Sequence, residues 1–445
     1  MVNVMWGRGV SRQLHCAHSS IAIRSAAEGL DAVREQKQLS IMQNMSWNMM
    51  GSLTGLVCQY LITVFVVRLS ADFDSAGLYS LAMSINGIFS PIAQYGIYTY
   101  QTTDVRDENT LGEYVTFILG TNLVSLAFTF VYAALTCRPN ALSIVLLYGI
   151  YKSCSIVLDI LHSYNQKKRR MDINGISMAL QGAASIVAFC AAFGITGDLS
   201  CALIAMTVGV VAVGVLYDLP ATKRLTSISL GITPQKATLL FKACLPIVVA
   251  NIAYGSIPSI PRQFLSSFQG DAALGIYASV AAPVAIVQAG ATYIYNPLIS
   301  YFAEYYVRRD KSGFVRLLKL TVVGIIGIGA VCVIGVALFA EPVLRLLYGQ
   351  TVAEHTYLMY PLVVSSLSIG TLSFLNNLFV AMRTSKSMLV TNLVALVVTL
   401  GLSVPLIMSF DMNGVTYALI VSCLAGIVYA SICIRVRLQG LERDT

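Results

Sequence analysis

The sequence has too few charged residues to cover the surface of a soluble protein. Asp, Glu, Lys and Arg make up 11% of the 445 residues, whereas roughly 25% is usual in soluble domains. Hydrophobic residues make up 56%, and the mean hydropathy is +0.73. An intrinsically disordered chain is excluded as well, because such chains are polar and poor in aliphatic residues. The composition predicts a polytopic membrane protein.

Motifs for nucleotide, metal and covalent chemistry are also missing from the sequence. There is no phosphate-binding P-loop and no Ser/His/Asp arrangement, and the ten cysteines form no CxxC pair. Most cysteines lie inside apolar runs, where cysteine acts as a small hydrophobe, so we expect no disulfide framework. We therefore expect no cofactor, no metal, no enzymatic activity and no ATP-driven transport by this chain alone.

Long apolar runs dominate the rest of the sequence. A transmembrane helix needs about 20 mostly apolar residues, and the runs of this kind are joined by short loops that leave no room for a soluble domain. The predicted fold class is an all-α polytopic membrane protein with twelve transmembrane helices. The predicted spans are residues 46–68, 77–100, 113–135, 141–164, 172–194, 199–219, 239–261, 273–300, 318–340, 356–382, 387–409 and 412–434.

The positions of Lys and Arg give the chain an orientation in the membrane. Cytoplasmic loops of membrane proteins carry an excess of these residues. With the N-terminus inside, nearly all of the 29 Lys and Arg fall on the inner side, and both termini are predicted to be cytoplasmic. The net charge of +8 is spread over these short loops and does not form one basic face, so we expect no nucleic-acid binding. The exceptions are Arg68, Arg138, Arg262 and Arg345, placed outside, and Lys152, placed inside a span.

The polar N-terminal segment, residues 1–41, lacks the apolar core and cleavage pattern of a secretory signal. We expect either a cytoplasmic tail or an upstream extension of a reading frame that begins at Met42 or Met45, without a specific function. The predicted division of the remaining chain is an N-terminal six-helix lobe at 42–219, a cytoplasmic linker at 220–238, a C-terminal six-helix lobe at 239–436 and a cytoplasmic tail at 437–445.

Two segments of the sequence share a pattern that indicates an internal repeat. Arg68 is followed by a short segment containing Asp and then by Gly77-Leu-Tyr; Arg262 is followed by a similar segment and Gly275-Ile-Tyr. The copies lie at spans 1/2 and 7/8, six spans apart. Because six is even, the two halves have the same orientation in the membrane. This predicts a parallel repeat, as in transporters that rock two lobes around a central substrate site.

These features resemble the polysaccharide-transporter family of the multidrug/oligosaccharidyl-lipid/polysaccharide exporter superfamily. The resemblance covers about residues 42–436 and rests on the twelve spans, the 6+6 division, Arg68, Gly77-Leu-Tyr and the basic loop that begins at Gln166. It implies a V-shaped fold of two lobes. It also implies translocation of an undecaprenyl-pyrophosphate-linked oligosaccharide between membrane leaflets, with cationic cavity residues that receive the pyrophosphate. Lys152 and Arg68 match that role.

The fourth span carries one polar stripe that includes Lys152, Asp159 and His162. At 100° per residue these side chains fall on one face, and Lys152 is about 18–21 Å from either end of the span. A charge at that depth is costly in lipid and by default marks a transport pathway. We expect Lys152 to face the cavity. The alternatives are a charge pair with Asp159 that only locks helices together within the lobe, and a lipid-facing lysine that snorkels.

Other candidate residues are polar positions on neighbouring spans and a proton-coupling pair. Asp159 and His162 are one turn apart, so each can sense the protonation of the other; the alternative is that Asp159 only neutralises Lys152. The second half shows no charge deep in a span, which places the predicted electrostatic work in the first lobe. The polar candidates, which line the cavity or hold helices together, are Asn48, Gln59, Asn174, Gln181 and Asn251.

Three functions compete at this point. The leading one is a flippase for lipid-linked oligosaccharide in the bacterial cytoplasmic membrane, with membrane lipid and the glycan polymerase or glycosyltransferases of its pathway as partners. The second is a cation-coupled antiporter of drugs or small solutes, which would need acidic cavity residues. The third is a membrane-embedded glycan polymerase or ligase, which the short outer loops disfavour.

Overall fold

The computed structural model describes residues 40–443 apart from 71, 105–106 and 296–297, so the predicted tail before residue 40 lies outside the described residues. Helices and short connections make up the described chain, which contains no strand. In the first half the helices are α2 (Ile41–Leu69), α3 (Asp74–Gln94), α4 (Ile97–Thr103), α5 (Leu111–Thr136), α6 (Pro139–Lys167), α7 (Met171–Thr196), α8 (Leu199–Val213), a π-helical turn η1 (Gly214–Asp218) and α9 (Leu219–Lys223).

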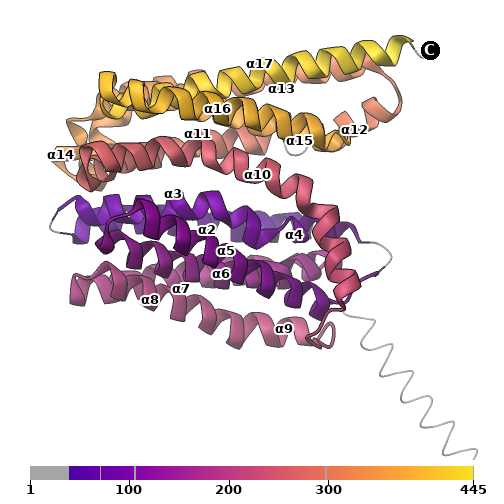
Figure 1. Cartoon of the computed structure of the whole chain (residues 1–445), viewed down its shortest axis with the longest axis horizontal. Helices are drawn as coiled ribbons and strands as arrows, with labels where there is room; N and C mark the ends of the chain where they lie inside the picture. Colours follow the sequence, from indigo (N-terminus) through magenta and orange to yellow (C-terminus); the bar gives the residue numbers. More distant parts are fainter. Residues whose placement is uncertain (1–39, 71, 105–106, 296–297, 444–445) are drawn as a thin grey trace, which may run out of the picture.

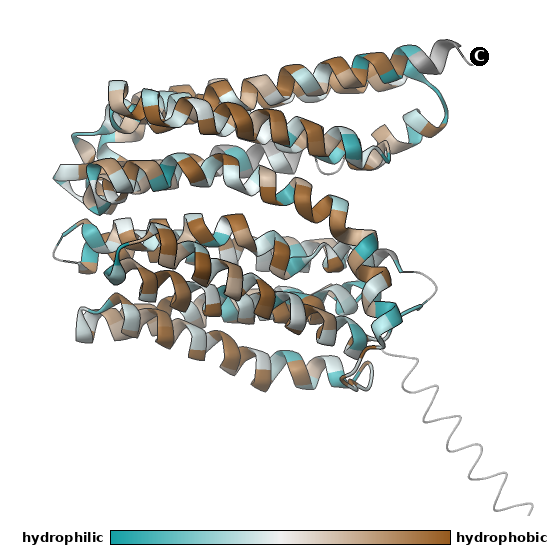
Figure 2. Cartoon of the chain, in the orientation of Figure 1, coloured by the Kyte–Doolittle hydropathy of each residue, from teal (hydrophilic) through white to brown (hydrophobic). Residues whose placement is uncertain are grey.

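The second half begins with α10 (Pro234–Gln269), a helix of 36 residues. It is followed by α11 (Asp271–Tyr295), α12 (Ile299–Val307), α13 (Lys311–Tyr348), α14 (Gln350–Ala353), a 3₁₀ turn η3 (Thr356–Leu358), α15 (Met359–Ala381), α16 (Ser385–Phe410) and α17 (Met412–Arg443). Eleven helices within the described residues are long and apolar enough to cross a membrane, and the shorter apolar stretch Asp271–Ala285 overlaps the predicted eighth span. Hydrophobic residues, drawn in brown, occur along these helices (Figure 2). The predicted all-α polytopic fold is confirmed.

The same helix pairs pack together in both halves, with an offset of six spans. In the first half α2 packs on α7, α7 on α8 and α3 on α6; in the second half α10 packs on α16, α16 on α17 and α11 on α15. The backbone repeats as well, because the turns after α6 and α15 each place an arginine in the left-handed region, Arg169 at φ 58° and Arg383 at φ 54°. The two halves form two adjacent bundles (Figure 1), as the sequence repeat predicts.

Helix α10 connects the two lobes by packing against both. Leu240 and Val248 belong to an apolar cluster of the first lobe, whereas Ala250 belongs to a cluster of the second. Near the start of α10, Lys236 Nζ pairs with a Glu113 carboxylate oxygen at 2.9 Å. Three internal prolines each remove a backbone donor and permit bends. The lobe boundary predicted at residue 239 therefore falls within a helix that both lobes share.

The lobes make close backbone contacts where α3 and α11 begin. Gly77 lies directly against the backbone of Asp271, and Gly275 lies against the backbone of Phe73 and Gly77. These are the two glycines of the sequence repeat, so each copy supplies the small residue that lets the other lobe approach. Because a Cβ atom at either position would overlap backbone atoms, this end of the molecule is closed by glycine-dependent packing.

Substitution at Gly77 is expected to disturb this contact. A valine side chain would overlap the Asp271 backbone, and overpacking of this kind typically costs about 1–3 kcal/mol. We expect Gly77→Val to lower the thermal unfolding temperature in detergent. Gly327→Val is the matched control, since Gly327 lies in a helix with nothing within 4 Å of its Cβ position. Equal unfolding temperatures for the two variants would contradict the packing role.

Candidate functional site

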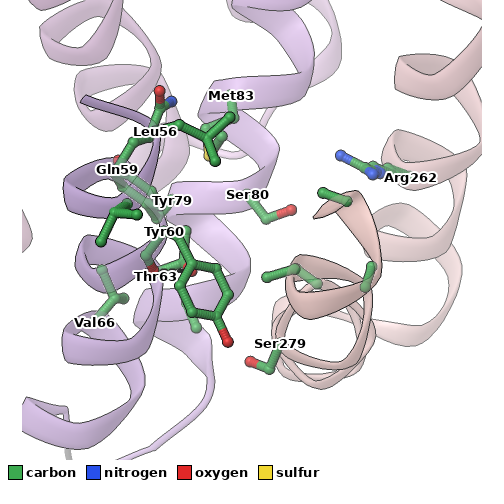
Figure 3. A pocket seen from close by; sticks show the side chains of 16 residues that line it. Leu56, Gln59, Tyr60, Thr63, Val66, Tyr79, Ser80, Met83, Arg262 and Ser279 are labelled. Carbon is green, nitrogen blue, oxygen red and sulfur yellow. Dashed lines mark hydrogen bonds between the residues drawn. The ribbon is translucent and has the colours of Figure 1, made fainter. Parts of the chain in front are cut away.

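A cavity of about 300 Å³ lies between the lobes, in the space bounded by α2, α3, α10 and α11. Most of the residues that line it are apolar or small, and both lobes contribute a few polar groups (Figure 3). It is adjacent to the glycine contacts, since Ala76 and Ala278 are one and three residues from Gly77 and Gly275. The polar residues in the described lining are Gln59, Tyr60, Thr63, Tyr79, Ser80, Arg262 and Ser279.

Arg262 is the single charged side chain among the described residues that line this cavity. The side chain is partly buried, and its Nε atom is enclosed without a hydrogen-bond partner. The seventh span was predicted to end at residue 261, but the helix continues past Arg262, because α10 extends through Gln269. Arg262 is seven residues before that end, or about 10 Å along the helix axis.

Arg68, the repeat partner of Arg262, occupies a different environment at the end of α2. Its side chain is exposed and donates from Nε to the Leu347 carbonyl at 2.8 Å and from Nη2 to the carbonyl of Leu346. These carbonyls belong to the last turn of α13, where a cation is favoured by the helix dipole. The structure thus places Arg68 on a helix C-terminus of the opposite lobe, and it is not among the described lining residues of the cavity.

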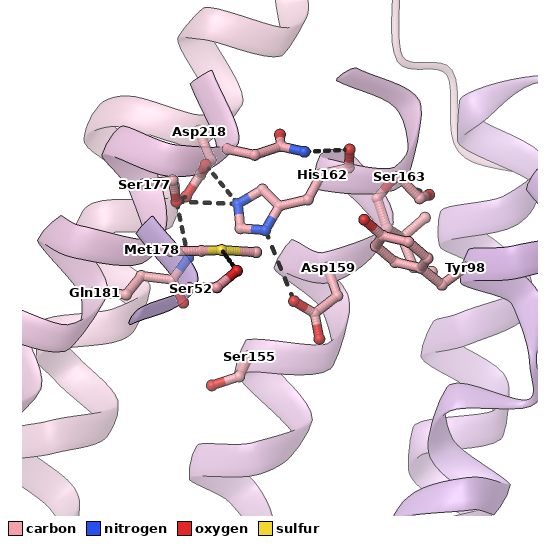
Figure 4. Close-up of polar contacts among 12 residues, drawn as sticks. Ser52, Tyr98, Ser155, Asp159, His162, Ser163, Ser177, Met178, Gln181 and Asp218 are labelled. Carbon is pink, nitrogen blue, oxygen red and sulfur yellow. Dashed lines mark hydrogen bonds and ion pairs between the residues drawn. The ribbon is translucent and has the colours of Figure 1, made fainter. Parts of the chain in front are cut away.

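A second group of polar residues is enclosed within the first lobe, where α6, α7 and η1 meet. His162 Nε2 lies 3.0 Å from Ser177 Oγ and 3.1 Å from Asp218 Oδ1. Ser177 Oγ donates to Asp218 Oδ2 at 2.8 Å and accepts from Gln181 Nε2 at 2.9 Å. Asn174 Nδ2 donates to the His162 carbonyl at 2.8 Å. The network holds the imidazole in a fixed orientation (Figure 4).

Asp159 lies on the other side of the imidazole from Asp218. Its Oδ1 is 3.7 Å from His162 Nδ1, too far for a hydrogen bond, and Nδ1 is enclosed without a hydrogen-bond partner. Asp159 is 45% exposed, whereas the side chains of His162 and Asp218 are 1% and 0% exposed. One carboxylate therefore faces open space and the other is fully enclosed, with the imidazole between them.

Asp218 was not singled out in the sequence, where it appears as one acidic residue at the end of the sixth span. Its position in the sequence could have indicated a role, because an acidic side chain within the sixth span needs a polar partner. The polar stripe of the fourth span could supply that partner. It ends the π-helical turn η1, and turns of this type occur frequently at functional sites. The turn presents Asp218 to His162, a pairing that required the packing of α8 and α6.

Lys152 lies earlier on α6, three residues before Ser155 and seven before Asp159. Its side chain is partly buried and forms no hydrogen bond or ion pair within 4 Å with any described residue. Asp159 is its electrostatic neighbour. The direct charge pair considered from the sequence is thus not formed, and whether Lys152 contacts substrate stays a prediction.

The remaining candidates are separated from these groups. Gln59 lines the cavity between the lobes, whereas Asn251 is a partly buried residue of α10 outside the described lining. Asn48 on α2 has an enclosed Oδ1 atom without a hydrogen-bond partner. Their roles in substrate binding also stay predictions.

Other charges near the end of α6 are paired within the protein. Lys167 Nζ lies 2.7 Å from Asp107 and 3.6 Å from Asp104. The hydrogen bond from Lys167 holds the pKa of Asp107 below its usual value. Lys167 is therefore engaged with loop carboxylates, in contrast to Lys152.

No family model matches the chain. A capsular polysaccharide biosynthesis protein, CapF of Staphylococcus aureus, is 23% identical over 343 residues, which is 76% of this chain and 84% of CapF.

Solved structures with a similar fold are membrane transporters. The lipid II flippase MurJ in an inward closed conformation has a TM-score of 0.68 at 10% identity, over 88% of this chain and 87% of MurJ. A mutant of the Vibrio cholerae MATE transporter VcmN has a TM-score of 0.60 at 14% identity, over 89% of this chain and 96% of VcmN. A MOP-superfamily transporter from Pyrococcus furiosus has a TM-score of 0.57 at 14% identity, over 89% and 94%. The chain therefore has the fold of the MOP-superfamily transporters, the exporter superfamily that its sequence resembles.

Proposed function

We propose that this chain is a flippase that moves an undecaprenyl-pyrophosphate-linked oligosaccharide across the bacterial cytoplasmic membrane by alternating access, for polysaccharide export. The observation that carries the proposal is the interlobe cavity, whose described lining holds one cation, Arg262, and no carboxylate. The fold shared with the flippase MurJ and the similarity to CapF support it. The proposed topology places both termini in the cytoplasm.

The chemistry of the cavity suits an anionic group that is followed by sugars. A guanidinium can grip a phosphate with two parallel hydrogen bonds, and Arg262 has an unpartnered donor. Gln59, Ser80 and Ser279 offer neutral groups from both lobes that can hydrogen-bond to hydroxyls. A volume of about 300 Å³ is at the lower end of drug-sized pockets, so the lobes must separate to admit a glycan while the lipid tail stays in the bilayer.

A cation-coupled antiporter is the second candidate, because Asp159 is an exposed carboxylate on a membrane helix and several structural neighbours are multidrug MATE transporters. An acidic group reached from the cavity would favour cationic drugs. The described lining of the interlobe cavity has the opposite charge, which favours the flippase.

The two candidates are tested in one reconstituted system. Purified protein in liposomes is supplied with undecaprenyl-pyrophosphate-linked oligosaccharide on one side, and a sugar-specific lectin measures its appearance on the other. Parallel vesicles contain a cationic dye and a pH or sodium gradient. We expect protein-dependent lectin binding and no gradient-driven dye movement. Dye movement without glycolipid translocation would contradict the flippase function and support the antiporter function.

Lys152 is expected to add a second cationic contact on the substrate path. Lys152→Ala should strongly reduce glycolipid translocation with insertion intact, whereas Lys152→Arg should keep part of it because the charge remains. Lys168→Ala is the matched control, since Lys168 lies in the turn after the same helix. Unimpaired translocation by the Lys152→Ala variant would remove Lys152 from the path.

A further inference from the structure

A second hollow lies on the far side of the second lobe, away from the cavity between the lobes. It is a groove of about 530 Å³ with α15 as its floor and α13 and α17 as its walls. Its described lining shares no residue with the interlobe cavity. The lining residues are Lys311, Val315, Leu318, Val322, Thr371, Phe374, Leu375, Ile427, Ser431, Ile434, Arg435, Leu438 and Gln439.

The groove has a cationic end and an apolar interior. Lys311 is the first residue of α13, and Arg435 lies eight residues before the end of α17, which is Arg443. Below them the walls are aliphatic and the floor includes the buried ring of Phe374. No Asp or Glu is present among the described lining residues, and Arg435 forms no ion pair within the described chain. The charge pattern is complementary to an anion attached to an apolar chain.

The length of the groove matches one leaflet of a membrane. Lys311 and Val322 are eleven residues apart on α13, or about 16 Å along the helix, and half of a hydrocarbon core of about 30 Å is about 15 Å. Lys311 and Arg435 lie at the end of the molecule that the Lys and Arg distribution places at the cytoplasmic surface. Basic pockets between membrane helices on that side are suited to anionic lipid head groups.

We propose that this groove is a binding site for an anionic phospholipid of the cytoplasmic leaflet. The phosphate lies between Lys311 and Arg435, and one acyl chain follows Val315, Leu318 and Val322 toward the bilayer midplane. A polyprenyl chain of the transported substrate is far longer than one leaflet, so a membrane phospholipid is the better fit to this depth. The site is independent of the proposed transport function, because its residues do not reach the interlobe cavity.

The test uses tryptophan fluorescence and brominated lipids. The chain has two tryptophans, which are replaced in the variant Trp6→Phe/Trp47→Phe. A reporter is introduced by Ser431→Trp inside the groove, and a second by Leu320→Trp on the opposite face of α13, where Leu320 is 65% exposed. Each protein is reconstituted in phosphatidylcholine containing either brominated phosphatidylglycerol or brominated phosphatidylcholine, and the ratio of quenching gives the lipid preference.

We expect the Ser431→Trp reporter to prefer phosphatidylglycerol and the Leu320→Trp reporter to show no preference. Each cation contributes roughly a fivefold preference, so Arg435→Gln or Lys311→Gln should each reduce the ratio by about that factor. Lys386→Gln is the matched control, because Lys386 is an exposed cation at the start of the neighbouring α16.

Three outcomes would overturn the proposal. Equal preferences at the two reporter positions would show ordinary annular lipid, and a ratio unchanged by both Arg435→Gln and Lys311→Gln would remove the head-group site. Displacement of brominated phosphatidylglycerol by undecaprenyl phosphate at lower concentration than by phosphatidylglycerol would assign the groove to the substrate tail instead. Each variant is compared only after its elution and unfolding temperature match those of the parent.

Discussion

Replacing Arg262 by alanine is expected to lower the rate of glycolipid translocation by about tenfold to a hundredfold. A hydrogen bond to a charged group contributes about 1.5–3 kcal/mol, and each 1.4 kcal/mol corresponds to about a factor of ten. The side chain lies in the cavity wall with an enclosed, unpartnered Nε, so its loss breaks no observed hydrogen bond within the described protein. The effect should therefore appear in transport and not in folding. The lectin assay in liposomes measures it.

A conservative variant and a matched control distinguish the loss of the Arg262 charge from a nonspecific effect of removing an arginine. Arg262→Lys should keep part of the activity, because it retains the charge but loses the planar fork. Arg345→Ala removes an exposed arginine from the end of α13, outside the described cavity lining, and should leave translocation unchanged. Full activity of Arg262→Ala, or equal losses in Arg262→Ala and Arg345→Ala, would contradict a substrate contact at Arg262.

The two carboxylates beside His162 are expected to respond differently to neutralisation. Asp218 is fully enclosed and bonded to His162 and Ser177. Removing one partner of a buried pair typically costs about 3–5 kcal/mol. Asp218→Asn should therefore lower protein abundance and the unfolding temperature. Because Asp159 is 45% exposed and makes no hydrogen bond to the imidazole, Asp159→Asn should leave both nearly unchanged.

Transport under a pH gradient then tests whether this group couples protons. If Asp159 and His162 change protonation during the cycle, Asp159→Asn should abolish the dependence of translocation on the gradient while substrate still binds. The measurement compares initial rates in liposomes with and without a pH difference across the membrane. If Asp159→Asn lowers stability and its residual activity keeps the gradient dependence, the pair is structural and the coupling hypothesis is wrong.

Periodicity and composition were sufficient for the architecture of this protein. A membrane helix must satisfy its own backbone hydrogen bonds and present about 20 apolar residues to lipid. The local sequence is therefore sufficient to predict where such a helix lies in the chain. Eleven of the twelve predicted runs coincide with helices long and apolar enough to cross a membrane, and the eighth begins in α11. The repeated Arg and Gly-aliphatic-Tyr patterns were also local, and they indicated the matching pairs of packed helices in the two halves.

The end of the seventh span could not be placed from local sequence. Pro258 and Pro261 are followed by polar residues, which resembles a helix end, yet α10 continues to Gln269. Prolines are tolerated in membrane helices when neighbouring groups satisfy the freed backbone. This extension brings Arg262 into the wall between the lobes, whereas its repeat partner Arg68 stays at a helix end and binds carbonyls of α13.

The partners of the polar side chains were decided by tertiary packing alone. The sequence placed Lys152, Asp159 and His162 on one face of a helix, because helical geometry fixes such relations within about two turns. It contained no information on which neighbouring helix would supply Asp218, 56 residues beyond His162. Hydrophobicity and charge thus determined the spans and the repeat, whereas the contacts between helices distant in sequence decided which charges are enclosed, which are paired and which face the cavity.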